Sequence, residues 1–251
     1  MKTTIKDTTD KLVYGHEGWL DAYVFHYHAG DSIMSMLKWG HNMEYDGLPR
    51  IEELTYKAFA PDGTVEEVTV KETGKEWLDL TSETDQEGYY IFSTVYDNCY
   101  AEYPGNKWKK GDRTQYPDAM NVGRYVQSAT NCIFVGHDGT NDIYAAPLPT
   151  SLLPVSPDFL AGHELTFELK TEGKPQATED VDLIFQGDDG NETTKLSTDA
   201  DGILKITPEK PGVYSLIARY QLDSDNPESY DKIHYTATHC FRIKEHDDHH
   251  H

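Results

Sequence analysis

Short segments in which apolar and polar residues alternate recur along the whole chain, and this period of two constrains the fold more than any other feature. Successive side chains of a strand point to opposite faces of a sheet, so the alternation predicts half-buried strands. β-branched and aromatic residues fill these segments, and turn residues separate them. Hairpin turns are expected at Pro61-Asp62-Gly63 and at Asp201-Gly202. The pattern therefore predicts an all-β protein built from antiparallel sheets.

Twelve segments carry the strand pattern, and one carries a helical pattern. The predicted strands are 22–28, 33–39, 54–59, 64–71, 89–96, 132–135, 165–171, 181–186, 192–197, 203–206, 212–221 and 232–243. A short helix is predicted over 119–130, because this segment follows the pair Pro117-Asp118. The expected fold is thus two β-sandwich, immunoglobulin-like domains with a short helix near 119–130.

A proline-rich segment divides the chain. Residues 146–157 hold four of the twelve prolines and no charged residue, so this stretch should run extended and interrupt the sheet pattern. We expect a linker at 148–157 between an N-terminal β domain, residues 16–147, and a C-terminal immunoglobulin-like sandwich, residues 158–245. Residues 1–15 are expected to be an N-terminal extension, and residues 246–251 form a histidine-rich tail.

The charge of the chain limits its partners. The sequence has 44 acidic and 22 basic residues, a net charge of −22, so we expect no binding to nucleic acid or to anionic membrane surfaces. Cations are the favoured partners of such a field. The longest apolar run is about four residues against the ~20 of a membrane-spanning helix, so no membrane insertion is expected. The first fifteen residues lack the apolar segment of a signal peptide.

Three cysteines leave two alternatives open. A bridge between Cys99 and Cys132 would close a loop of 34 residues and stabilise the protein by roughly 3–4 kcal/mol in an oxidising compartment. The other interpretation is three partly buried free thiols. No CxxC pair is present, so a thiolate zinc site of that type is not expected.

The common catalytic motifs are absent from the sequence. The pairs His16-Glu17 and His163-Glu164 begin like the zinc-protease motif HExxH, but the fifth positions are Leu20 and Phe167. There is no GxSxG, P-loop or GxGxxG. Acidic turns at 187–190 and 199–202 lack the remaining ligands of a calcium loop and indicate ordinary turns. We therefore expect a protein that is not an enzyme.

Five of the twelve histidines are candidate metal ligands. Residues 26 and 28 are two apart in a predicted strand, so both imidazoles share a face, although an exposed polar face is the alternative. Residues 16 and 41 each follow a glycine near a strand end, where they either approach a shared site or cap a backbone carbonyl. Residue 137 follows another strand end. The candidate ligands are His16, His26, His28, His41 and His137.

The other histidines have simpler interpretations. His163 occupies a turn, and His234 and His239 lie five apart on one predicted strand, on opposite faces, which favours packing. The tail 246–251 would gather metal weakly; the interleaved Asp pair favours a native tail, and a remnant of a purification tag is the alternative.

An ordered set of motifs resembles a bacterial family. The segments GHEGWLDAYVFHYHAGD (15–31), RYVQSATNCIFVGH (124–137), GHELTFELKTEGKP (162–175) and ITPEKPGVYSL (206–216) are similar, in this order, to periplasmic nickel/cobalt uptake components, the soluble proteins associated with energy-coupling-factor transporters. The resemblance implies a periplasmic protein that binds Ni²⁺ or Co²⁺ and hands it to a membrane transporter component, with the signal peptide absent from the sequence given.

Two further points concern ligand and function. Imidazole ligands also accommodate Zn²⁺ and Cu²⁺, so the preference for Ni²⁺ or Co²⁺ comes from the resemblance alone. The alternative function is an extracytoplasmic adhesive or carbohydrate-binding β-sandwich module, for which 17 Tyr and 4 Trp could form a stacking surface.

Overall fold

The computed structural model describes residues 15–74, 76–137, 139 and 142–245. Within these residues the chain is all-β, as expected, with one 3₁₀ segment at Ile51–Glu53. Its strands form three sheets. Among the described residues we find no helix with the length and apolar character needed to cross a membrane.

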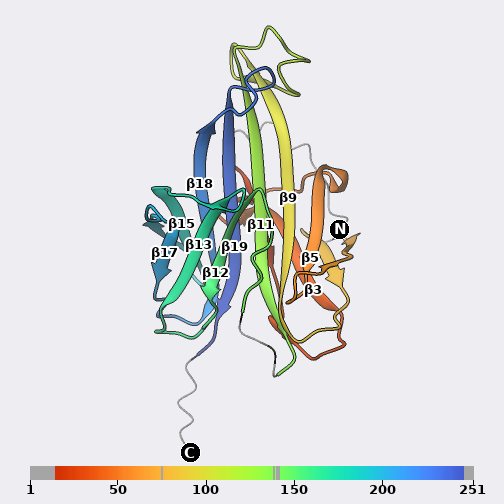
Figure 1. The fold of residues 1–251 in the computed structure, drawn as a ribbon, viewed down its shortest axis with the longest axis vertical. Helices are drawn as coiled ribbons and strands as arrows, with labels where there is room; N and C mark the ends of the chain where they lie inside the picture. The colour runs from red at the N-terminus through yellow and green to blue at the C-terminus, as the bar shows by residue number, and fades with distance from the viewer. Residues whose placement is uncertain (1–14, 75, 138, 140–141, 246–251) are drawn as a thin grey trace, which may run out of the picture.

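A ten-stranded sheet runs through both halves of the chain. Its four long central strands, β9, β11, β19 and β18, lie side by side along the molecule (Figure 1). β11 and β19 pair in parallel from Gly123↔Lys232 to Asn131↔Cys240 and so join the two halves. In order, the sheet contains β16 (Gly190–Leu196), β15 (Asp180–Gly187), β18 (Gly212–Asp223), β19 (Lys232–Ile243), β11 (Asn121–Val135), β9 (Gly88–Tyr103), β5 (Leu54–Phe59) and β6 (Val65–Glu66), with β10 (Lys107–Lys110) on β9 and β2 (His26–Tyr27) on β11.

Two smaller sheets contribute the other layer of each sandwich. The N-terminal one contains β1 (Glu17–Asp21), β3 (Ile33–His41), β8 (Leu78–Ser82) and β7 (Thr69–Glu72), with β4 (Glu44–Tyr45) on β3. The C-terminal one contains β12 (Thr150–Ser156), β13 (Leu165–Thr171) and β14 (Lys174–Pro175), with β17 (Ile203–Ile206) on β13.

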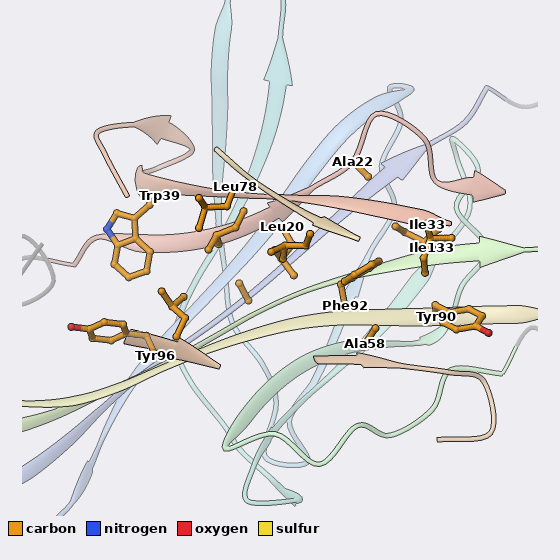
Figure 2. Packing of buried hydrophobic residues seen from close by; sticks show 14 of the residues in the cluster. Leu20, Ala22, Ile33, Trp39, Ala58, Leu78, Tyr90, Phe92, Tyr96 and Ile133 are labelled. Atoms are coloured by element: carbon orange, nitrogen blue, oxygen red, sulfur yellow. The ribbon is translucent and has the colours of Figure 1, made fainter. Parts of the chain in front are cut away.

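Each smaller sheet packs its apolar face on the large sheet. On the N-terminal side, Leu20 and Trp39 meet Phe92 in a buried cluster (Figure 2). On the C-terminal side, Phe167 and Phe241 form the corresponding core, with ring centroids 5.2 Å apart. The alternation of the sequence therefore corresponds to two sandwiches that share one sheet.

The predicted helix at 119–130 is wrong, because residues 121–130 lie in β11. The strand is covered on both faces: Ala129 and Ile133 pack in the cluster that contains Leu20, whereas Cys132 packs in a cluster with Leu153 of β12. A strand buried on both faces loses the alternation of a half-buried strand, so the period of two is hidden here.

The proline-rich segment is also part of a sheet. Residues 150–156 of the predicted linker form β12, which pairs antiparallel with β13 and shifts register between Pro154 and Ser156. β12 is an edge strand, where proline leaves no partner carbonyl unsatisfied. The segment runs extended, as expected, but it does not interrupt the sheet pattern.

The two predicted turns have different roles. Gly63, with φ of 88°, donates its N–H to the Ala60 carbonyl in the turn between the paired strands β5 and β6, so this hairpin is confirmed. Gly202, with φ of 74°, donates to the Asp199 carbonyl in a similar turn. That turn connects β16 to β17, which belong to different sheets, so it is not a hairpin.

All three cysteines are free thiols. Cys99 lies opposite Arg124 in the β9–β11 register, eight positions from Cys132 along β11, so about 26 Å of strand separates the two cysteines. A disulfide needs Cα atoms within about 7 Å, so the proposed Cys99–Cys132 bridge is wrong. Burial raises the pKa of the Cys99 thiol to about 11 and that of the Cys132 thiol still further.

Candidate metal sites

The structure divides the five candidate histidines into two groups. His26, His28 and His137 form one group, which we call the histidine trio, and His16 and His41 form the other, the histidine pair. The Gln127 side chain donates to the His16 carbonyl, and His26 is in register with Phe134, seven residues further along β11. The two groups therefore lie about 23 Å apart and do not form a single site.

The trio is assembled by a parallel pairing between distant segments. β2 lies beside the end of β11, with Phe134↔His26 and Val135↔Tyr27 in register. The chain leaves β11 at Val135, so His137 falls next to β2. The ring centroids of the trio are 6.2 Å apart for His26 and His28, 5.5 Å for His26 and His137, and 5.3 Å for His28 and His137. All three side chains are exposed.

This spacing is close to what one ion requires. Metal–nitrogen bonds of about 2.1 Å place the centroids of ligating imidazoles roughly 4.5–5.2 Å apart. The observed separations are up to about 1 Å wider, and in the described residues no group of three His, Cys, Asp or Glu side chains is already arranged to hold an ion. Binding at the trio therefore requires the exposed rings to rotate toward a common point.

The tautomer of His26 favours ligation. Its Nε2 lies 2.8 Å from the Gly136 carbonyl oxygen, and a carbonyl only accepts, so Nε2 carries the proton. The lone pair is then on Nδ1. Metal-ligating histidines commonly donate their second ring N–H to a backbone carbonyl in this way, because the bond fixes the tautomer and the ring orientation.

Two carboxylates lie beside the backbone of the trio. The His28 N–H donates to Asp31 Oδ2 at 3.0 Å, and the His137 N–H lies 3.4 Å from Glu87 Oε2. Both carboxylate side chains are exposed. Their negative charge adds to the field that favours a cation at this end of β11.

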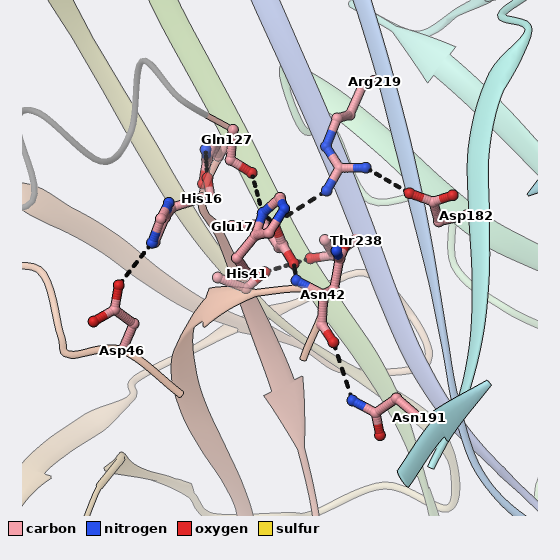
Figure 3. A network of polar contacts seen from close by, with 12 residues as sticks. His16, Glu17, His41, Asn42, Asp46, Gln127, Asp182, Asn191, Arg219 and Thr238 are labelled. Atoms are coloured by element: carbon pink, nitrogen blue, oxygen red, sulfur yellow. Dashed lines mark hydrogen bonds and ion pairs between the residues drawn. The ribbon is translucent and has the colours of Figure 1, made fainter. Parts of the chain in front are cut away.

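The histidine pair belongs to a different environment (Figure 3). The rings of His16 and His41 stack with centroids 5.6 Å apart, and His16 Nε2 lies 2.9 Å from Asp46 Oδ2. His41 Nδ1 lies 3.6 Å from Glu17 Oε2 and 3.3 Å from the Gly15 carbonyl. His16 Nδ1 is buried and has no hydrogen-bond partner.

Glu17 connects the pair to the C-terminal half. Its side chain is fully buried; Oε1 accepts from the Asn42 N–H at 2.6 Å and Oε2 from Arg219 Nη2 at 3.1 Å. Arg219 also donates to Asp182 at 2.9 Å. Burial raises the pKa of Glu17, while Arg219 and His41 act in the opposite direction. One ring nitrogen of each histidine of the pair thus already has a protein partner, and the pair fits a structural network better than an open site.

The remaining described histidines match their expected roles. His163 Nδ1 lies 2.6 Å from Asp158 Oδ2 beside a turn. His234 stacks on Tyr125 with centroids 4.5 Å apart, and His239 is completely buried. The tail 246–251 lies outside the described residues, as does the N-terminal extension apart from Gly15.

Sequence reasoning did not identify a cavity of about 280 Å³ beside the trio. Its walls come from segments scattered over the chain, so no local pattern indicates it. The lining includes Phe25, His26, Phe134, Phe159, Arg242 and Lys244. Asp46, Glu17 and Arg219 of the network around the pair were likewise not singled out.

Comparisons with known proteins identify a family. The family model described as Domain of unknown function (DUF4198) matches residues 13–222. No curated protein matches the sequence.

Solved structures give weak similarity only. A DUF4785 family protein from Legionella pneumophila is 13% identical, with TM-score 0.29 and coverage of 78% of this chain and 51% of that one. Salmonella alpha-2-macroglobulin is 10% identical, with TM-score 0.30, over 89% of this chain and 15% of that one. The Escherichia coli adhesin FdeC is 13% identical, with TM-score 0.27, over 88% and 63%. This chain thus spans about half of the Legionella protein. TM-scores this low indicate nothing about function.

Proposed function

Since this chain belongs to the family described as domain of unknown function DUF4198, we propose that it is a non-enzymatic periplasmic protein that binds Ni²⁺ or Co²⁺ and delivers the ion to a membrane transporter. The histidine trio is the proposed binding site. The assignment to nickel or cobalt, the periplasm and the transporter rests on the motif resemblance.

The observation that carries the proposal is the convergence of three imidazoles. His26 and His28 are 109 or more residues away from His137 in sequence, yet all three ring centroids lie within 6.2 Å of one another. Each imidazole offers one ring nitrogen lone pair, so three neighbouring rings can donate to one shared ion. Imidazole suits nickel, cobalt, copper and zinc.

The site is also suited to release. Three imidazoles occupy half of an octahedral coordination sphere and leave the other half to water or to an exchanging ligand. Exposure of the trio permits ligand exchange with a partner, as delivery requires. The net charge of −22 raises the local concentration of cations.

The test is a titration of the full chain in which His246, His249, His250 and His251 are each replaced by Asn, so that the tail contributes no imidazole. Isothermal calorimetry with Ni²⁺ and with Co²⁺ should give one ion per chain. Replacing His26, His28 and His137 together by Ala should weaken this binding by at least about 100-fold, because ligand groups are lost and even supporting partners are worth 10–100-fold. Acidification should also weaken it, since only neutral imidazole binds metal.

His163→Ala is the matched control, because the His163 side chain is 37% exposed and lies outside the trio. The double variant His16→Ala/His41→Ala separates the trio from the pair. If the triple variant still binds one ion per chain, the trio is not the binding site. If only the double variant loses this binding, the binding site is the histidine pair. Delivery is tested by metal accumulation in cells that carry the triple variant in place of the natural chain.

A further inference from the structure

The cavity beside the trio combines aromatic walls with two cations. His26 lines the cavity, and its ring lies 5.6 Å from that of Phe134. Tyr89 continues the wall, with its ring 4.9 Å from Phe134 and 6.4 Å from Phe159. A continuous aromatic surface therefore leads away from the trio.

The two cations stand at the exposed rim of this surface. Arg242 places its guanidinium 5.6 Å from the centroid of the Phe25 ring, and Lys244 follows two residues later. Both side chains are exposed. In the described part of the chain neither has a carboxylate within ion-pair distance, although several other cations, such as Arg124 with Asp97, are paired.

Their position has an electrostatic consequence. Asp31 and Glu87 favour a cation at the trio itself, whereas Arg242 and Lys244 favour an anion in the adjoining cavity. Two cations without a carboxylate partner among the described residues are also unexpected in a chain with a net charge of −22, in which carboxylates are abundant. The cavity is thus better matched to an anion with an apolar part than to a hydrated cation.

We propose that the trio binds its metal ion as a complex with a small polycarboxylate chelator that carries an apolar group. The three imidazoles fill half of the coordination sphere and the chelator fills the rest. Its apolar group occupies the aromatic cavity, and a free carboxylate lies between Arg242 and Lys244. This inference rests on the proposed function and adds the chemical class of the cargo.

The experiment compares two nickel complexes that present the same three donor atoms to the ion. Ni²⁺–N-(4-carboxybenzyl)iminodiacetate carries an aromatic ring with a free carboxylate, and Ni²⁺–N-methyliminodiacetate carries neither. Calorimetry on the full chain with the four tail histidines replaced by Asn should give at least about tenfold tighter binding of the carboxybenzyl complex. In the variant Arg242→Gln/Lys244→Gln this preference should fall below about threefold, while binding of Ni²⁺ alone is not weakened.

Lys57→Gln/Lys71→Gln is the matched control. It removes the same charge from two exposed lysines on β5 and β7, neither of which lines the cavity, and should keep the preference. Equal binding of the two complexes by the natural cavity would overturn the inference, as would an unchanged preference in the Arg242 and Lys244 variant. If Ni²⁺ alone then still binds at the trio, the proposed function stands; if neither Ni²⁺ nor either complex binds, both proposals fail.

Discussion

At the residue scale, the buried His239 is held in its neutral form. Thr130 Oγ1 donates to the Thr238 carbonyl at 3.1 Å, so its other contact, with His239 Nδ1 at 2.9 Å, must be accepted from the ring. The proton is therefore on Nδ1, and Nε2 is buried without a partner. Burial lowers the pKa of His239 to about 3, well below the ordinary value of about 6.5.

This burial predicts a pH-dependent stability. Between pH 6.5 and 3 the unfolded chain binds a proton at His239 that the folded chain does not, so folding weakens as the pH falls through this window. The expected contribution is about 1.4 kcal/mol per pH unit. The variant His239→Leu, which retains an apolar side chain, should lose less stability between pH 6.5 and 4.5 than the natural chain, measured by urea unfolding.

His163→Leu serves as the comparison, because His163 is only half-buried and its replacement leaves the fully buried His239 in place. Parallel pH profiles for the natural chain and His239→Leu would contradict the assignment of this acid sensitivity to His239.

At the element scale, the sequence pattern predicts several strands with the bounds that the structure has. Four predicted strands have the same first and last residues as observed ones: 54–59 (β5), 165–171 (β13), 203–206 (β17) and 232–243 (β19). The failures have physical causes: β11 is covered on both faces, β12 contains Pro154, and β10 (Lys107–Lys110) contains three lysines. These segments depend on tertiary neighbours, which a local pattern does not contain.

The candidate site likewise has a part that the local sequence predicts and a part that depends on tertiary pairing. His26 and His28 are close because they are two residues apart, although the predicted strand at 22–28 is reduced to β2 (His26–Tyr27) and His28 follows it. The position of His137 depends on the parallel pairing of β2 with β11, which joins segments over 100 residues apart. The sequence therefore indicates all three histidines of the trio as candidate ligands, but it contains no signal that they lie apart from His16 and His41.

The β9–β11 register makes a direct prediction about the thiols. Cys99 and Cys132 lie eight positions apart along paired strands, so oxidation of the folded protein should not join them. Alkylation of unreduced, denatured protein should modify three cysteines, as counted by mass spectrometry. A reductant should leave the urea midpoint unchanged; a lower midpoint together with one alkylated cysteine would mean that two of the thiols are bridged.

At the scale of the whole molecule, the two sandwiches are joined through more than a linker. β11 and β19 share nine paired positions, and Arg219 of β18 bonds Glu17 of β1 (Figure 3). Thr238 Oγ1 donates to the Gly18 carbonyl at 2.7 Å. A buried cluster also brings Trp19 of the N-terminal half against Ile217 of the C-terminal half. Separating the halves would expose this core and the inner edges of β11 and β19.

The shared sheet predicts that both halves unfold together. All four tryptophans, Trp19, Trp39, Trp77 and Trp108, precede residue 148, so tryptophan fluorescence reports the N-terminal half, whereas far-UV circular dichroism reports strands of both halves. The two signals should give the same urea midpoint, as one cooperative transition requires.

The variant Trp19→Phe tests this coupling more strictly. Trp19 contacts the C-terminal half, so in the variant all fluorescence comes from tryptophans outside that junction cluster. Coincident midpoints are expected in this variant too, although both should fall, because a smaller ring fills the junction less well. Two separate midpoints would mean that the β11–β19 ladder does not couple the sandwiches.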